Sequence, residues 1–127
     1  MHTDATPGNI LFNNDLLTAL IDFELIPGTF LFDLSLSAIR WAGRFDPNTK
    51  TNRLDSAWLT DFFRAYNKAR LFTDAEKPVI KDVLLLAATW SWGRQRPHRI
   101  DDPAWRLSSR GEIYIDICDL NAETLTD

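Results

Sequence analysis

Cysteine is almost absent from this chain, and its scarcity limits both redox and metal chemistry. Cys118 is the only cysteine among 127 residues, so an intrachain disulfide is impossible and a reducing compartment is favoured. The two histidines lie far apart in the sequence, and no spacing typical of a zinc-thiolate site occurs. The sequence therefore predicts neither a disulfide scaffold nor a zinc centre, and a cytoplasmic location is the expectation.

Long apolar runs and an excess of positive charge are also missing. The longest apolar run, residues 83–88, is too short to span a bilayer, and polar residues interrupt the N-terminal segment where a signal peptide would be apolar. The formal net charge of −4 argues against nucleic-acid binding, because binding to the phosphate backbone requires a concentrated positive face. We therefore expect a soluble globular protein with neither a membrane nor a nucleic acid as partner.

The N-terminal part of the chain has the pattern of a β-hairpin. Apolar runs at residues 10–12 and 16–23 are separated by Asn13-Asn14-Asp15, and Asn and Asp tolerate the positive φ angles of tight turns. Residues 16–21 are apolar on both faces except for Thr18, which is typical of a strand buried on both sides. The sequence thus predicts a hairpin whose second strand is fully buried.

Helical periodicity begins after this hairpin. Apolar residues spaced three and four apart predict a largely buried helix over residues 30–43 and a second helix over about 55–70. A polar segment, residues 46–52, is predicted as a loop between them. Aromatic residues at helical spacing in both helices are interpreted as core residues.

The C-terminal half is predicted to contain a third helix and a tail. Residues 73–76 have the capping-box pattern, and Pro78 is expected to delay the regular helix by a few residues, after which it continues to about Gly93. The alternating pattern over residues 113–117 suggests a strand or an extended tail, with helix left open. The last residues are expected to fray.

Three polar residues flank the predicted hairpin in an arrangement that suits phosphoryl transfer. That reaction requires a carboxylate beside the attacking hydroxyl, for which Asp4 is the candidate, and hard oxygen ligands for Mg²⁺, for which Asn9 and Asp22 are the candidates. An Asp and an Asn at this spacing also occur in ordinary turns. The prediction depends on their coincidence with the hairpin and with a second acid at its end.

This segment resembles the aminoglycoside phosphotransferase and homoserine/choline kinase family. The family's His-x-Asp-x-x-x-x-Asn loop falls on His2, Asp4 and Asn9, and its Ile-Asp-Phe-acid strand end falls on residues 21–24. The resemblance implies ATP and Mg²⁺ as cofactors, with Asp4 as catalytic base. It also implies that Asn9 and Asp22 bind the metal and, through it, the nucleotide.

Three further residues acquire roles from the same resemblance. Glu24 matches the family's second acid, which lies near the metal or its water shell. His2 corresponds to a side chain that braces the loop. Asp33 matches the acid of a Tyr-Asp-Leu-Ala element that holds the catalytic loop through backbone hydrogen bonds. From the residues alone, the alternative role for Asp33 is a helix N-cap, and both roles are structural.

The resemblance also implies a fold. We expect one α+β, mainly helical domain over residues 1–127, corresponding to the C-terminal lobe of a protein-kinase-like fold. It would comprise a catalytic loop and hairpin (1–29), a helical subdomain (30–97) and a tail of uncertain role (98–127). The family's N-terminal lobe, with its phosphate-covering loop and strand lysine, has no counterpart in these residues. A full-length chain would have to supply that lobe, and the isolated chain is predicted to be inactive.

Two functions are compatible with these observations. The first is the catalytic lobe of an ATP- and Mg²⁺-dependent kinase that phosphorylates a hydroxyl of a small polar molecule, such as a homoserine-like amino alcohol or an aminoglycoside. The alternative is a non-catalytic remnant or interaction module that keeps the kinase-like lobe. The presence of Asp4, Asn9 and Asp22 together favours the catalytic origin, because a binding module does not require all three.

Overall fold

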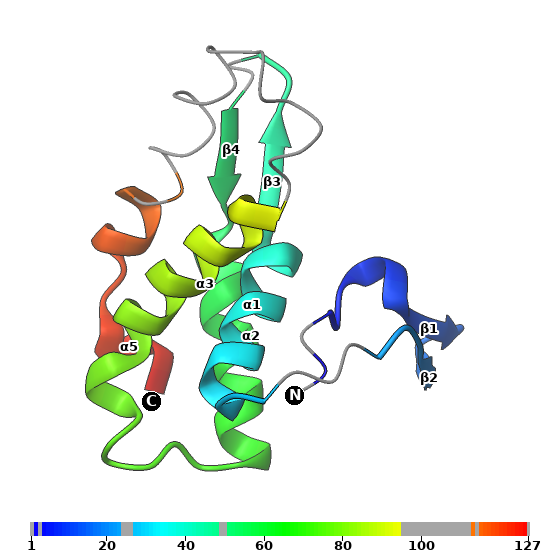
Figure 1. The fold of residues 1–127 in the computed structure, drawn as a ribbon, viewed down its shortest axis with the longest axis horizontal. Helices are drawn as coiled ribbons and strands as arrows, with labels where there is room; N and C mark the ends of the chain where they lie inside the picture. The colour runs from blue at the N-terminus through cyan, green and yellow to red at the C-terminus, as the bar shows by residue number, and fades with distance from the viewer. Residues whose placement is uncertain are drawn as a thin grey trace.

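The computed structural model describes residues 2, 4–23, 27–48, 51–94, 113 and 115–126 (Figure 1). This part of the chain is mostly helical and contains two small antiparallel sheets, so the coarse α+β prediction is confirmed. The elements with defined bounds are η1 (Pro7–Asn9), β1 (Ile10–Asn13), β2 (Leu16–Leu20), α1 (Phe30–Ala42), β3 (Gly43–Asp46), β4 (Thr51–Leu54), α2 (Ser56–Ala69), η2 (Lys77–Val79), α3 (Ile80–Arg94) and α5 (Ala122–Thr126).

The helices form the body of the molecule, and the β1–β2 hairpin stands to one side of it (Figure 1). Helix α1 packs against both α2 and α3, and α5 packs against α2. The largest fully buried apolar side chains come from α1, α2, α3 and the C-terminal segment: Leu36, Leu59, Phe63, Ile80, Leu84, Ile117 and Leu125. Helix α1 is buried along most of its length, as its apolar pattern predicts. No helix in the described part of the chain is long and apolar enough to cross a membrane.

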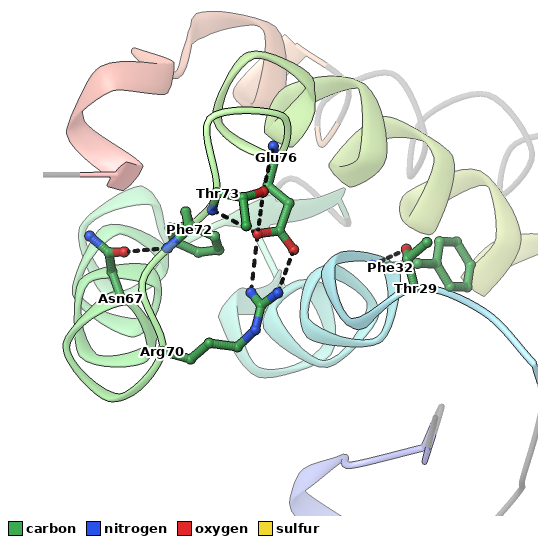
Figure 2. Close-up of polar contacts among 7 residues, drawn as sticks. All are labelled: Thr29, Phe32, Asn67, Arg70, Phe72, Thr73 and Glu76. Carbon is green, nitrogen blue, oxygen red and sulfur yellow. Dashed lines mark hydrogen bonds and ion pairs between the residues drawn. The ribbon is translucent and has the colours of Figure 1, made fainter.

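Local capping explains where α1 and α2 begin. The Thr29 hydroxyl accepts a hydrogen bond from the Phe32 N–H at 3.3 Å (Figure 2), and the Asp55 carboxylate accepts one from the Trp58 N–H at 3.0 Å. Both helices therefore lie within a residue or two of their predicted bounds. Because Thr29 caps α1, the N-cap interpretation of Asp33 is wrong.

The connection into α3 is a reciprocal capping box (Figure 2). The Thr73 N–H donates to Glu76 Oε2 at 2.9 Å, while the Glu76 N–H donates to Thr73 Oγ1 at 3.2 Å. Arg70 closes the turn with two hydrogen bonds to the Glu76 carboxylate, at 3.0 and 3.1 Å. Regular helix starts only at Ile80, which confirms the delay predicted from Pro78.

The prediction of a loop over residues 46–52 is wrong at both of its ends. Strands β3 and β4 pair antiparallel, with Gly43 opposite Leu54. The Asp116 carboxylate supports this hairpin by accepting hydrogen bonds from the Leu54 N–H at 2.8 Å and from Arg53 Nη2 at 2.7 Å. The local polar pattern of residues 46–52 could not predict these strands, because the residue that supports them lies more than sixty positions away in the chain.

The prediction that residues 16–21 form a strand buried on both faces is also wrong. Strand β2 pairs only with β1 in the described residues, and Leu16 is 75% exposed. The hairpin itself forms as predicted, with Asn14 at a φ of 54° in its turn. Burial of both faces requires a layer on each side of a sheet, and the helical body covers one side at most.

In the C-terminal segment the suggested strand or extended tail is wrong, and the helix that the sequence analysis left open is what forms. Residues 115–119 are helical, and Ile113 and Ile117 are buried while Ile115 is exposed. This is the i, i+4 spacing of one helix face, which the short alternating pattern masked. The prediction of fraying is wrong for residues 122–126, because α5 packs on α2 and Leu125 is fully buried.

Candidate active site

The loop before the hairpin is held in shape by its own backbone. The Asp4 carbonyl accepts a hydrogen bond from the Thr6 N–H at 2.7 Å, and the Thr6 carbonyl accepts one from the Asn9 N–H at 2.9 Å. The Asn9 carbonyl then accepts one from the Ile21 N–H at 3.0 Å. This last bond closes the hairpin and places Asn9 and Asp22 at the same end of it.

Helix α1 fixes the loop from the other side. The Asp33 carboxylate accepts a hydrogen bond from the His2 N–H at 2.9 Å, and the Trp41 indole donates to the Ala5 carbonyl at 2.9 Å. Between these two contacts, Arg40 Nη1 forms an ion pair with Asp4 Oδ1. The loop is therefore tied to one buried helix at three positions on both sides of Asp4.

Asn9 joins the candidate base to the candidate metal site. Its side-chain amide nitrogen donates to Asp4 Oδ2 at 2.6 Å and to the Asp4 carbonyl at 3.0 Å. This orientation commits the nitrogen to Asp4, so Oδ1 is the atom of Asn9 with the chemistry to bind a cation. The Asp4 carboxylate is about one-quarter exposed and is bound through both oxygens, to Arg40 and to Asn9.

Asp22 lies in the left-handed region of backbone conformation, with a φ of 59°. Such a conformation is uncommon for a residue with a Cβ atom, and residues held in it are concentrated at functional sites. Its carboxylate and the Asn9 amide oxygen are hard donors that fit Mg²⁺, which binds through one or two carboxylates and keeps several waters. Among the described residues, no three His, Cys, Asp or Glu side chains form a metal-binding group. The remaining candidate ligand, Glu24, lies outside the described residues.

Comparison with known proteins finds one matching family model. The family model described as the phosphotransferase enzyme family matches residues 1–77, which is more than half of the chain. The chain belongs to the phosphotransferase enzyme family. The matched residues include the loop, the β1–β2 hairpin, α1 and α2, so the resemblance drawn from the loop and strand motifs is confirmed. No curated protein and no solved structure gives a significant match. The catalytic and metal-binding roles of individual residues stay predictions.

His2 contacts both the loop and the segment that follows the hairpin. Its Nδ1 accepts a hydrogen bond from the Asp4 N–H at 3.3 Å, and its ring lies 4.3 Å from the Phe23 ring, measured between centroids. Its Nε2 is buried without a hydrogen-bond partner in the described structure. These contacts suit a residue that braces the loop.

An apolar cleft of about 470 Å³ lies between the hairpin and helices α1 and α2, and it reaches the loop before the hairpin at Ala5. Trp41 and Trp58 stack with centroids 6.0 Å apart and form one wall, which Phe62 extends. Among the described lining residues, Asp33 carries the only charge. The lining residues are Ala5, Ile10, Phe12, Leu17, Phe30, Asp33, Leu34, Ser37, Trp41, Trp58, Phe62 and Tyr66.

The interpretation of the helical aromatics as core residues is therefore only half right. Trp58, Phe62 and Tyr66 pack against the core and also face the cleft. Helical spacing identifies the inward side of a helix, but it does not show whether another element covers that side. No signal in the sequence distinguishes an aromatic side chain that is covered by the core from one that faces a cleft.

Proposed function

We propose that the loop and hairpin form the catalytic part of an ATP- and Mg²⁺-dependent kinase that phosphorylates a hydroxyl of a small polar molecule. The observation that supports this most strongly is the placement of Asp4, Asn9 and Asp22. Asn9 is hydrogen-bonded to Asp4 through its side chain and to Ile21, next to Asp22, through its backbone. Asn9 thus links the loop residue proposed as base to the strand end that carries Asp22, and phosphoryl transfer requires a base and metal ligands near one another.

Each residue has a distinct task in this proposal. Asp4 orients the acceptor hydroxyl and accepts its proton late in the reaction. Asn9 Oδ1 and the Asp22 carboxylate hold Mg²⁺, and Glu24 is proposed to act near the metal or its water shell. When bound, Mg²⁺ neutralises charge on the ATP phosphates. His2 and Asp33 support the loop. Further contacts to the α and β phosphates are assigned, by the resemblance, to a lobe like the N-terminal lobe of the family.

The lining of the cleft beside Ala5 suits one of the two proposed acceptor classes better than the other. Its aromatic walls and single described carboxylate suit a molecule with one ammonium group and an apolar part. An aminoglycoside carries several ammonium groups, and burying unpaired cations against apolar side chains is costly. By this count of ammonium groups, the lining favours an amino alcohol with a single ammonium group over an aminoglycoside as acceptor.

Metal binding tests the proposal without requiring turnover. The 127-residue chain is titrated with Mn²⁺, which substitutes for Mg²⁺ and is detected by electron paramagnetic resonance, with and without millimolar ATP. We expect binding that ATP strengthens and that Asp22→Asn or Asn9→Ala weakens at least tenfold, because each removes a proposed hard ligand. Asp15→Asn is the matched control, since Asp15 lies in the turn at the opposite end of the same hairpin.

Two results would contradict the proposed kinase function. Absence of Mn²⁺ binding at millimolar ATP would favour the non-catalytic remnant. Equal weakening by Asp15→Asn and Asp22→Asn would show that the ion responds to the overall charge of the hairpin rather than to a site.

A further inference from the structure

In the described part of the chain, Arg40 is the cation paired with the candidate base, and no role proposed so far uses it. It lies near the C-terminal end of α1, with its side chain 21% exposed, and its Nη1 is paired with Asp4 Oδ1. We propose that Arg40 is a positioning residue that keeps the Asp4 carboxylate out of the metal site at Asn9 and Asp22. This inference rests on the proposed function, because it requires that metal site.

The need for such a residue follows from the position of Asn9. Asp4 Oδ2 lies 2.6 Å from Nδ2 of Asn9, whose other side-chain atom is the proposed metal ligand. Asp4 is therefore one amide group away from a divalent cation. An ionised carboxylate is a stronger ligand for a hard cation than a neutral amide oxygen, so an unpaired Asp4 would be drawn to the ion. A carboxylate bound to the metal would be a poorer base for a hydroxyl.

The guanidinium group suits this task for two reasons. It keeps its positive charge at every physiological pH, so it balances Asp4 permanently. It also bonds to Oδ1, whereas Asn9 bonds to Oδ2, so the two partners hold the carboxylate from different sides. Arg40 thereby fixes the orientation of Asp4 as well as its charge.

The loop does not depend on Arg40 alone for its position. Asp33 holds the His2 backbone on one side of Asp4, and Trp41 holds the Ala5 carbonyl on the other. A substitution at Arg40 therefore changes the charge beside Asp4 while these two contacts remain. This separation allows an electrostatic role to be distinguished from a structural one.

Mn²⁺ affinity of the 127-residue chain, measured with ATP present, is the test. We expect Arg40→Gln to bind Mn²⁺ about fivefold more tightly, because one partly exposed negative charge is released close to the ion. Arg40→Lys retains the charge and should keep the wild-type affinity. The charge-neutral double variant Arg40→Gln/Asp4→Asn should also return to the wild-type affinity. Arg64→Gln, at an exposed site on α2, is the matched control for loss of a cation.

The outcomes separate this inference from the proposed function. If the wild-type chain binds no Mn²⁺, the proposed function fails, and the Arg40 assignment fails with it. If the wild type binds Mn²⁺ but Arg40→Gln binds equally or more weakly, only the Arg40 assignment is overturned, and the ion pair is merely structural. If Arg40→Gln does not fold, the double variant decides, because a loss of Mn²⁺ affinity there would show that Asp4 is itself a metal ligand.

Discussion

The backbone N–H of His2 donates a hydrogen bond to Oδ2 of Asp33 at 2.9 Å, which joins the start of the loop that carries Asp4 to the first turn of α1. A carboxylate is favourable at this position, because the N-terminal end of a helix carries partial positive charge. Asp33 thus interacts favourably with its own helix while it holds a loop that lies 31 residues earlier in the chain.

Loss of the Asp33 carboxylate should loosen the loop and leave the helical body intact. We expect Asp33→Ala to increase amide hydrogen exchange at Asn9 and Ile21 by about tenfold, because a hydrogen bond to a charged acceptor contributes about 1.5 kcal/mol. Exchange in the centre of α3 should not change. Asp61→Ala removes an exposed carboxylate from α2 and is the control. Uniformly faster exchange throughout the chain would contradict a local role for Asp33.

Local features of the chain could be predicted from the sequence, and they include most of the candidate site. The hairpin turn at Asn14 and the Thr73–Glu76 capping box each depend on residues within a few positions of one another. Asp4 and Asn9 are equally close in sequence, so the spacing of the motif already implies their proximity. Asp22 follows from the hairpin, because strand pairing returns the chain to Asn9.

The features that sequence reasoning missed depend on distant partners. Arg40 reaches Asp4 across 36 residues, and Asp116 reaches Leu54 across 62. In neither pair does the local pattern mark one residue as the partner of the other. The exposure of β2 has a related cause, since an apolar strand shows what a sheet can bury but does not show which layers cover it.

The left-handed backbone of Asp22 makes two substitutions differ in stability although both remove the same carboxylate. Asp22→Gly should be about 1 kcal/mol more stable than Asp22→Ala, because glycine adopts a positive φ without the steric cost that a Cβ atom brings. Both variants should lose Mn²⁺ affinity equally. Urea unfolding and the Mn²⁺ titration measure the two effects separately. Equal stability of the variants would show that the backbone at residue 22 relaxes to a negative φ.

The Arg70–Glu76 pair predicts a pH dependence of stability. Hydrogen bonds from the Arg70 side chain and then from the Thr73 backbone lower the pKa of the Glu76 carboxyl below its ordinary value of 4.5. Because the pKa is lower in the folded state, this contribution is fully present above pH 4.5 and is lost as the pH falls through the folded-state pKa. Wild type should therefore be more stable than Glu76→Gln near neutral pH, and the difference should shrink in acid.

Urea unfolding of both proteins, near neutral pH and well below pH 4.5, measures this difference. Asp74→Asn changes a fully exposed carboxylate in the same turn and serves as the control. A stability difference between wild type and Glu76→Gln that is equal at both pH values would contradict the prediction. It would show that Glu76 acts through its shape in the capping box rather than through its charge.

The C-terminal segment gives the last prediction, because the structure makes it part of the core. Leu125 is fully buried where α5 packs on α2, whereas Ile115 is 58% exposed. Leu125→Ala should lower the free energy of unfolding by about 2–4 kcal/mol, since it leaves a cavity in a packed site. Ile115→Ala should change it by less than about 0.5 kcal/mol. Both substitutions remove apolar atoms from the same short segment, so a frayed C-terminus would make both effects small. Chemical denaturation measures the free energy of unfolding of both variants and therefore decides whether α5 is part of the packed helical body.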